Sequence, residues 1–269
     1  MNLDRELITA LAAVALAGEY ARREYEAFKP IPNAAASIST HVDHEAQQII
    51  LRHLRTAFPD DGICAEEKTP LAETAPNNTH RVWVVDPIDG TRGFAMKNGE
   101  FSVMVGFTVN QITVLGVVLE PILYRTTYAA LGQGCWVKVG EDAPLQCHVT
   151  AVQTLEKSVL TQSHSKPGQP PKSVVTSLQP VQIIETYSAG IKLAMVARGE
   201  VEMYVNDYRN FHDWDICAGH ILVEEAGGQV SLFNGQPVTY GGIGAKQRRG
   251  MVATNGHIHS EVVERLATI

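Results

Sequence analysis

The feature that most constrains the fold of this chain is an apolar run that leads directly into a pair of aspartates. Residues 82–85 (Val-Trp-Val-Val) have the composition of a buried strand. The six residues that follow are Asp86, Pro87, Ile88, Asp89, Gly90 and Thr91. Pro87 forces a turn between the two aspartates, so both carboxylates and the carbonyl of Ile88 can be aimed at one point. Mg²⁺ prefers such a cluster of oxygen ligands.

Gly90 and Thr91 extend this motif beyond the aspartates. They offer backbone N–H groups, and Thr91 a hydroxyl, close to the same point, which suits a phosphate oxygen. An Asp-Pro turn and a glycine turn are each common on their own. Their combination behind an apolar strand predicts a site for metal and phosphate.

Two other segments carry carboxylates that could complete such a site. Glu66 and Glu67 follow an apolar stretch, and at most one of them faces the metals because consecutive residues of a strand point to opposite faces. Asp215 stands at the start of a predicted helix. Taken alone, the glutamates fit a solvated strand end, and Asp215 fits a helix N-cap equally well.

Hydrophobic patterning divides the chain into two halves. In residues 1–147, two helix patterns precede a mostly antiparallel set of strands; the helices are at 3–28 and 39–58, and the strands at 82–85, 101–109, 113–119 and 124–131. In residues 148–269 strand and helix patterns alternate, with strands at 158–161, 181–185 and 201–205 and helices at 188–198 and 213–226. Loops are predicted at 163–172 and 241–250, and we expect the second loop to be mobile. We expect an α+β half that carries the metal motif and an α/β half that completes the site.

Composition narrows the range of partners. The formal net charge of −7 argues against a nucleic acid polymer or an anionic membrane. An acidic protein with a phosphate substrate needs positive charge at its site, which bound metal ions provide. The apolar run 11–17 is too short to span a bilayer, and the four cysteines include no C-x-x-C pair. We therefore expect a cytoplasmic enzyme with reduced thiols, either a monomer or a homodimer.

The three carboxylate segments together resemble the inositol monophosphatase superfamily of lithium-sensitive, metal-dependent phosphatases. Its signatures are a Glu-Glu pair, an Asp-Pro-Ile/Leu-Asp-Gly-Thr segment after a Trp-containing strand, and a Trp-Asp-x-x-Ala-Gly helix start. Glu66-Glu67 and residues 83–91 and 214–219 match them in order and spacing. The resemblance covers essentially the whole chain and implies an α+β fold, the layered αβαβα sandwich shared with fructose-bisphosphatase.

This resemblance implies a set of metal ligands. Glu66, Asp86 and the carbonyl of Ile88 would hold the ion that binds the attacking water. Asp86, Asp89 and Asp215 would hold a second ion beside the leaving oxygen. The implied cofactor is Mg²⁺, with two or three ions in the site.

The resemblance also implies catalytic and substrate-binding residues. Asp43 matches the aspartate of the family's Thr-x-Ala-Asp motif, although Val42 replaces the alanine. It would pair with the Thr91 hydroxyl and orient the water, so the expected catalytic residues are Asp43, Thr91 and Glu66. The residues expected to contact the substrate are Gly90, Thr91, Ser188, Lys192, Tyr208, Arg209 and Asp215.

Within the superfamily, the sequence is closest to the 3′(2′),5′-bisphosphate nucleotidase branch. Residues 98–103, 115–118 and 188–192 look like that branch, and Lys192 near Tyr208-Arg209 would give positive charge for a second phosphate. Inositol monophosphatases place a glutamate where Tyr208 stands, or Asp207 if the register shifts by one. The expected reaction removes the 3′-phosphate of 3′-phosphoadenosine 5′-phosphate, a step linked to sulfur assimilation, by metal-activated water without a covalent intermediate.

Other interpretations of the sequence remain open. The chain could be an inositol monophosphatase or another small sugar-phosphate phosphatase, or a catalytically silent nucleotide-binding homologue. Lys192 fits a solvated helix lysine equally well. Phosphatases that form an aspartyl-phosphate are excluded, because one residue separates their two aspartates, whereas two separate Asp86 from Asp89.

Cys64 and Cys217 lie two residues from Glu66 and Asp215, respectively. Oxidation of these thiols would disturb the neighbouring ligands, which suggests redox control as a hypothesis. The alternative is that both are small buried hydrophobic side chains.

Overall fold

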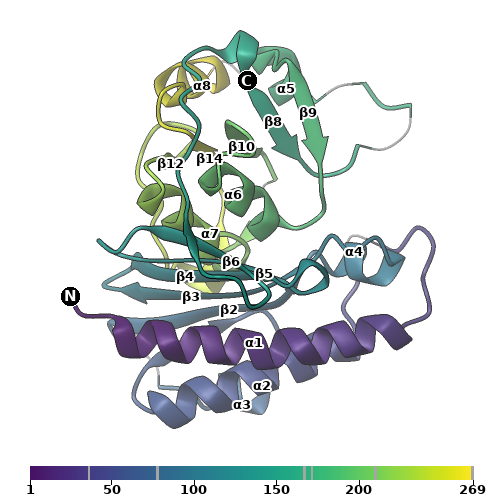
Figure 1. Cartoon of the computed structure of the whole chain (residues 1–269), viewed down its shortest axis with the longest axis vertical. Coiled ribbons are helices and arrows are strands. Elements are labelled where there is room, and N and C mark those ends of the chain that lie inside the picture. The colour runs from purple at the N-terminus through teal and green to yellow at the C-terminus, as the bar shows by residue number, and fades with distance from the viewer. Residues whose placement is uncertain (36, 77–78, 166–167, 171, 209–210, 268–269) are drawn as a thin grey trace.

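A computed structural model describes residues 1–35, 37–76, 79–165, 168–170, 172–208 and 211–267. The chain forms five layers in which helices and sheets alternate (Figure 1). From one side to the other, these layers are helices α1 to α3, a seven-stranded sheet, helices α6 and α7, a five-stranded sheet, and helices α5 and α8. The predicted αβαβα sandwich is therefore confirmed. Among the described residues, no helix is long and apolar enough to cross a membrane.

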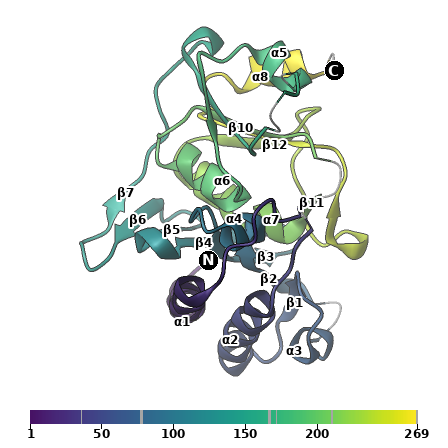
Figure 2. The ribbon, with the colours of Figure 1, turned by 90° about the vertical axis from the view of Figure 1, so that its right-hand side faces the viewer.

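The first sheet is built from the N-terminal part of the chain, and its strands follow chain order from β1 to β7. Figure 2 shows β1 and β7 at opposite edges of this sheet. Only β1 and β2 are parallel, and the other neighbours are antiparallel, as predicted. The strands are β1 (Gly62–Ala65), β2 (Arg81–Asp89), β3 (Ser102–Val109), β4 (Ile112–Glu120), β5 (Arg125–Ala130), β6 (Cys135–Val139) and β7 (Leu145–Gln146).

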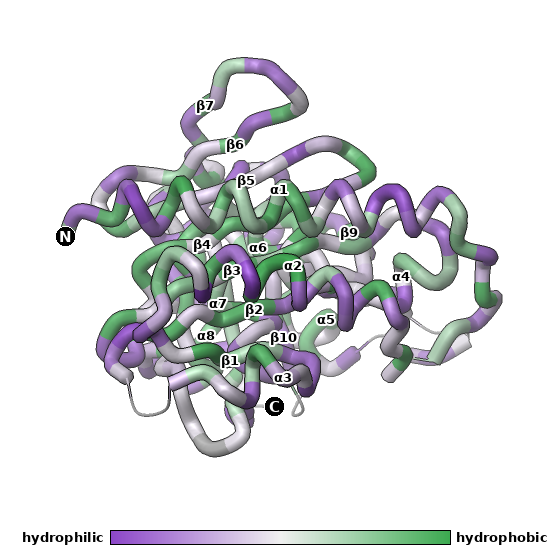
Figure 3. Tube along the Cα trace, turned by 90° about the horizontal axis from the view of Figure 1, so that it is seen from below, coloured by the Kyte–Doolittle hydropathy of each residue, from purple (hydrophilic) through white to green (hydrophobic). Residues whose placement is uncertain are grey.

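Helices α1 (Asp4–Ala27) and α2 (His41–Ala57) lie side by side across the outer face of this sheet (Figure 3). Their apolar stripes pack against the sheet, where Trp83 and Phe107 stack with ring centroids 4.4 Å apart. Thr40 caps α2 in a capping box with Asp43. The cap fixes the start of α2 and turns the Asp43 carboxylate toward the helix N-terminus. Short helix α3 (Pro70–Glu73) lies beside α2.

The second sheet has the strand order β12-β14-β10-β8-β9. Its strands β8, β9 and β10 are parallel, so their carboxyl ends share one edge, and in Figure 1 β8 and β9 run toward the first sheet. The strands are β8 (Val159–Gln162), β9 (Gln182–Glu185), β10 (Met203–Asn206), β12 (Gln229–Leu232) and β14 (Met251–Thr254). Helices α5 (Ser173–Leu178) and α8 (His259–Leu266) cover its outer face.

Helices α6 (Ala189–Ala197) and α7 (Asp213–Glu225) fill the space between the sheets. Two glycines that pair across β3 and β4, Gly106 and Gly116, let α7 approach the first sheet closely. A Cβ on Gly116 would lie 2.0 Å from the carbonyl oxygen of Ala218, and one on Gly106 would lie 2.6 Å from the sulfur of Cys217. The sequence therefore fixes α7, which carries Asp215, directly on the sheet that carries Asp86 and Asp89.

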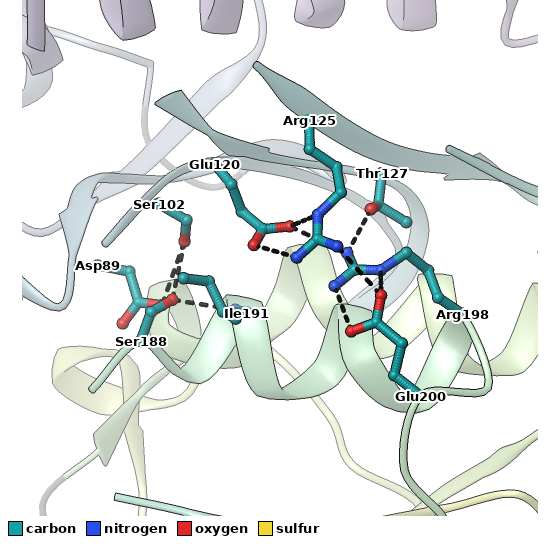
Figure 4. Close-up of polar contacts among 9 residues, drawn as sticks. All are labelled: Asp89, Ser102, Glu120, Arg125, Thr127, Ser188, Ile191, Arg198 and Glu200. Atoms are coloured by element: carbon teal, nitrogen blue, oxygen red, sulfur yellow. Dashed lines mark hydrogen bonds and ion pairs between the residues drawn. The ribbon is translucent and has the colours of Figure 1, made fainter. Parts of the chain in front are cut away.

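A buried ion network holds the carboxyl end of α6 to the first sheet (Figure 4). Arg198 bonds Glu120 at 3.1 Å and Glu200 at 2.7 Å, and it also donates to the Thr127 hydroxyl. Arg125 donates to both carboxylate oxygens of Glu120, each at 2.7 Å. Removing one partner of such a buried network leaves an uncompensated charge and costs about 3–5 kcal/mol. The network thus fixes α6 over β4 and β5.

Some predicted elements differ from those in the structure. Strand β2 does not stop at Asp86-Pro87 but continues to Asp89, because a register shift against β3 takes up the proline. The loop expected to be mobile at 241–250 contains β13 (Lys246–Gln247), which pairs with β11 (Phe211–His212). Gln247 is buried and donates to the carboxylate of Asp213 at 2.8 Å. Helices α3, α5 and α4 (Thr91–Met96) were not predicted, because each is six residues or shorter.

Short 3-10 turns occur at Pro121–Leu123, Leu155–Lys157 and Ile243–Ala245. The division at residues 147 and 148 stays a proposal. The two sheets fall on either side of it, but α7 belongs to the second half of the chain and packs on the first sheet.

We predict that Gly116→Ala destabilises the protein by about 3 kcal/mol, the upper end of the range for overpacking, because the new methyl group meets backbone rather than a movable side chain. Urea unfolding followed by circular dichroism measures this change. Gly242→Ala is the matched control, since its Cβ would meet only the Lys246 carbonyl at 4.0 Å and its φ is −64°. Equal stability of the two variants would contradict the close approach of α7.

Candidate metal centre and active site

The structure brings Asp86, Asp89 and Asp215 together. One carboxylate oxygen from each lies within 4.8 Å of the other two. Asp86 and Asp89 come from the end of β2, where the register shift around Pro87 allows both side chains to reach the same side. Asp215 comes from the first turn of α7 and accepts a hydrogen bond from the backbone N–H of His212. These are three of the residues that the sequence predicts as metal ligands.

Glu66 lies next to this triad. It follows β1, which runs parallel to β2, and its N–H donates to the Val85 carbonyl at 3.2 Å. The carboxyl groups of Glu66 and Asp86 lie close enough to share a hydrogen bond when one is protonated. Glu67 instead bonds the Ser39 hydroxyl at 2.7 Å and lies 3.1 Å from the His44 ring. Of the two glutamates, Glu66 is therefore the one beside the aspartates.

Crowding of like charges makes this cluster electrostatically unfavourable, although only Asp86 and Asp89 are fully buried and Glu66 remains exposed. Desolvation by the surrounding chain, followed by repulsion from Asp215, raises the pKa of Glu66 to about 8. Desolvation, followed by repulsion from Asp89, raises the pKa of Asp215 to about 7. The pKa values of Asp86 and Asp89 are also raised, chiefly by burial. Either protons or a bound cation would relieve this repulsion.

The chain itself supplies little positive charge to the cluster. In the part of the chain that the structure describes, no lysine or arginine forms an ion pair with these four carboxylates; Asp215 has a histidine, His212, at 3.8 Å. Clustered carboxylates that lack a lysine or arginine partner and offer only oxygen ligands fit a hard divalent cation such as Mg²⁺. The donor set therefore agrees with the metal site that the sequence predicts.

Asp89 is held by the amino end of α6 (Figure 4). Its Oδ2 accepts hydrogen bonds from the Ser188 hydroxyl and, at 2.6 Å, from the Gly190 N–H. Ser102 donates to the same oxygen at 3.4 Å and also lies 3.0 Å from Ser188. These donors occupy Oδ2, so Oδ1 is the oxygen left for a metal ion. Ser188, which the sequence assigns to the substrate, thus contacts Asp89.

Asp43 and Thr91 form the pair that the resemblance implies. The Thr91 hydroxyl lies 2.8 Å from Asp43 Oδ1 and 2.9 Å from the Ile88 carbonyl oxygen. The other Asp43 oxygen accepts from the N–H and hydroxyl of Thr40, at 2.9 and 2.6 Å. Asp43 is therefore fixed at the start of α2 and next to the predicted metal-ligand carbonyl of Ile88. Burial raises the pKa of Asp43.

Lys192 is 1% exposed and lies in α6. Its ammonium donates to the Ser163 hydroxyl at 3.0 Å, the Thr186 carbonyl at 2.9 Å and the Tyr187 carbonyl at 3.1 Å. Burial lowers its pKa to about 8, against the attraction of Asp89. All three N–H groups are used within the protein, so the substrate contact expected from the sequence would require one of these bonds to break.

The remaining predicted substrate residues have different settings. Gly90 adopts a φ of +87°, and a Cβ there would lie 2.7 Å from the Glu100 carbonyl, so only glycine fits without strain. Tyr208 is 63% exposed, and its N–H bonds the Asn206 side chain. Arg209 lies outside the described residues.

Sequence reasoning missed a polar cluster beside this site. His164 lies 2.7 Å from Glu100 and stacks near Tyr187, with ring centroids 4.4 Å apart. The guanidinium of Arg92 lies 5.1 Å from the centre of the same tyrosine ring. The sequence offered one signal for this cluster, the position of Arg92 directly after Thr91. The cluster was missed because it joins segments that lie far apart in the sequence.

The thiols near the site are poorly suited to redox chemistry. Burial raises the pKa of Cys64 to about 12, and it also raises the pKa of Cys217. Thiolates are the reactive form of cysteine, so both residues are better described as small hydrophobic side chains, Cys217 buried and Cys64 partly buried. These surroundings argue against the redox hypothesis.

We predict that the metal-free protein loses stability as the pH rises from about 4.5 to about 8, the interval between the unfolded and folded pKa values of Glu66. In this interval the folded state binds more protons than the unfolded state, so raising the pH favours unfolding. Mg²⁺ should reverse the loss. Asp215→Asn removes one charge from the cluster, so at pH 8 it should raise the Tm in EDTA and reduce the Mg²⁺-induced increase in Tm.

Asp61→Asn is the control for that experiment, because Asp61 is a buried carboxylate that bonds Arg81 and Trp83 away from the cluster. It should lower the Tm with and without metal and keep the Mg²⁺-induced increase. A metal-free Tm that rises with pH over this interval would contradict the electrostatic account.

Comparisons with known proteins agree with this geometry. Residues 2–269 match the model of the inositol monophosphatase family. A fructose-1,6-bisphosphatase/inositol-1-monophosphatase of Thermotoga maritima is 32% identical over 84% of this chain and 81% of its own length. The 3′(2′),5′-bisphosphate nucleotidase CysQ of Salmonella typhimurium is 31% identical over 82% of this chain and 83% of its own.

The fold has the same relatives. The solved structure of an inositol monophosphatase from Thermotoga maritima superposes with a TM-score of 0.80 at 28% identity and covers 98% of this chain and 97% of that one. The inositol monophosphatase from Anabaena gives a TM-score of 0.79 at 26% identity and covers 100% and 98%. With the carboxylate cluster in place and the match extending over the whole chain, the protein belongs to the inositol monophosphatase family of metal-dependent phosphatases.

Proposed function

We propose that this phosphatase uses Mg²⁺ to remove the 3′-phosphate of 3′-phosphoadenosine 5′-phosphate, giving AMP and phosphate. The observation that carries the catalytic part is the position of the Asp43–Thr91 pair. The Thr91 hydroxyl lies within hydrogen-bonding distance of both Asp43 and the Ile88 carbonyl, in the segment that supplies Asp86 and Asp89. The proposed cation site and a proton acceptor therefore lie side by side. We place the activity in the cytoplasm.

The proposed ligands divide among two or three Mg²⁺ ions. Glu66, Asp86 and the Ile88 carbonyl would hold one ion, and Asp86, Asp89 and Asp215 would hold another. When bound, Mg²⁺ lowers the pKa of a coordinated water and neutralises charge that develops on the leaving oxygen. Asp215 also borders the substrate.

The protein's own residues orient the nucleophile. When the Thr91 hydroxyl donates its single proton to Asp43, its oxygen can accept a hydrogen bond from the attacking water. The bonds from Thr40 keep Asp43 in place for this role. The N–H groups of Gly90 and Thr91 are proposed to donate to the phosphate. Positioning and electrostatics then supply the catalysis, without a covalent intermediate.

The choice of substrate rests on details around the site. Relatives named as bisphosphate nucleotidases and as inositol monophosphatases are equally similar to the chain. The nucleotide is favoured by Tyr208, an exposed aromatic residue at the position where inositol monophosphatases have a glutamate, because an aromatic ring can stack on a base. We propose that Ser188 holds Asp89 in place and that Lys192 fixes the backbone of residues 186–187.

Phosphate release from a panel of substrates tests this function. The panel contains 3′-phosphoadenosine 5′-phosphate, inositol 1-phosphate and fructose 1,6-bisphosphate, each with Mg²⁺, with and without Li⁺. We expect the highest kcat/KM for the nucleotide, and inhibition by Li⁺. Preference for inositol 1-phosphate would favour the alternative phosphatase activity. Nucleotide binding without phosphate release from any substrate would identify a silent homologue.

We predict that Thr91→Val lowers kcat about 10²- to 10⁴-fold with a smaller change in KM, because the water loses its orienting hydroxyl. Thr91→Ser keeps the hydroxyl and should retain most of the activity. Initial rates at saturating Mg²⁺ measure both, and thermal unfolding checks that each variant is folded. Equal activity of the serine and valine variants would exclude Thr91 from the orienting role.

A further inference from the structure

Arg92 is a cation beside the proposed active site whose partner is missing. Its guanidinium lies over the Tyr187 ring at 5.1 Å, and its Nε is buried without a hydrogen-bond partner. Across the described ranges of the chain, no carboxylate forms an ion pair with Arg92. An unsatisfied buried donor costs about 1–3 kcal/mol, so this arrangement needs an explanation.

The nearby carboxylates are already bound to other groups. Glu100 bonds the His164 ring at 2.7 Å and the backbone N–H of Tyr187 at 3.1 Å. Glu185 accepts from the Ser165 hydroxyl at 2.7 Å and from the Gln162 amide at 3.0 Å. Glu100 and Glu185, the acidic residues that contact His164, thus have other partners, and neither forms an ion pair with Arg92.

The position of Arg92 connects it to the reacting groups. It directly follows Thr91, and Tyr187 directly precedes Ser188, whose hydroxyl holds Asp89. Gly90 packs against the backbone of Ser188, where a Cβ would approach to 3.2 Å, so the two segments lie in contact. The Lys192 ammonium donates to the carbonyls of Thr186 and Tyr187 and so fixes this segment. Arg92 and Tyr187 therefore belong to the two segments that carry Thr91 and hold Asp89.

The chemistry of this position suits a phosphate. A guanidinium keeps its charge at all relevant pH values and presents a planar fork that binds phosphate oxygens in pairs. The cation–π contact with the Tyr187 ring, at 5.1 Å, favours this position of the guanidinium. Lys192 cannot do the same without losing a hydrogen bond, because its three N–H groups are all engaged.

We propose that Arg92 binds the second phosphate of a bisphosphorylated substrate, the one that is not hydrolysed, and thereby sets the preference for bisphosphates over monophosphates. Tyr187 is the positioning residue that orients the guanidinium. This proposal rests on the proposed function, in which the substrate is 3′-phosphoadenosine 5′-phosphate, and it assigns to Arg92 the role that the sequence suggested for Lys192.

The test compares Arg92→Ala with the unmodified protein on two substrates that differ only in the second phosphate, 3′-phosphoadenosine 5′-phosphate and adenosine 3′-phosphate. The ratio of their kcat/KM values should fall about 10- to 100-fold, the effect of losing charge-assisted hydrogen bonds. The loss should appear mainly in KM for the bisphosphate. Arg92→Lys, which keeps the charge without the fork, should restore part of the ratio.

Two controls separate this role from a structural one. Lys138→Ala removes a positive charge from β6, which lies near the opposite edge of the first sheet from β1 and β2. This variant should leave the ratio unchanged. Tyr187→Leu removes the stacking partner and should lower the ratio in the same direction as Arg92→Ala, though by less. If Arg92→Ala is poorly folded, Arg92→Gln and Tyr187→Leu provide the same comparison.

The outcomes distinguish this inference from the proposed function. If the unmodified protein prefers the nucleotide bisphosphate and Arg92→Ala keeps that preference, the inference alone is wrong. If it does not hydrolyse the nucleotide but prefers fructose 1,6-bisphosphate to fructose 1-phosphate, the proposed substrate is wrong and the same ratio on the sugar pair tests Arg92. An enzyme that discriminates neither pair overturns both.

Discussion

Repulsion among four neighbouring carboxylates, the buried Asp86 and Asp89 and the more accessible Glu66 and Asp215, is the interaction on which the proposed active site depends. Three separate elements deliver these groups to one place: the end of β1, the end of β2 and the start of α7. Desolvation and mutual repulsion raise the pKa of each, so the metal-free site holds protons more tightly than isolated carboxylates do. A bound divalent cation would relieve this electrostatic repulsion. Metal binding should therefore stabilise the folded protein.

The remaining layers hold these carboxylates against their repulsion. Glycines in β3 and β4 bring α7 into contact with the first sheet, which fixes Asp215. Helix α6 is held at both ends, by the Glu120–Arg198 network and by the bond from Ser188 to Asp89 (Figure 4). A change at the network can therefore alter the placement of Asp89, a proposed metal ligand, at the opposite end of the helix. This link joins packing between layers to the chemistry of the site.

Local patterns in the sequence predict much of this arrangement, and contacts between distant segments account for most of what they miss. The long helices α1 and α2 and the antiparallel strands follow from hydrophobic periodicity, and the Asp86–Asp89 spacing predicts a metal site by itself. Short α4 was missed because six residues give too little periodicity, and β2 was cut short because a proline normally ends a strand. The contact between Arg92 and Tyr187 joins segments about 100 residues apart in the sequence, and the partners of Lys192 depend on loop geometry. No local sequence pattern encodes either.

The most direct test of this account is a crystal structure of the protein soaked in Mn²⁺, which scatters anomalously and takes the place of Mg²⁺ at oxygen sites. We expect an anomalous peak bound by Asp86, Asp89 and Asp215, with metal–oxygen distances of about 2.1–2.2 Å, and a second peak beside Glu66 and the Ile88 carbonyl. The Asp89 Oδ2 should remain bound to Ser188 and Gly190. Carboxylates that stay protonated at neutral pH with no peak among them, in protein that hydrolyses phosphate esters, would contradict the central claim.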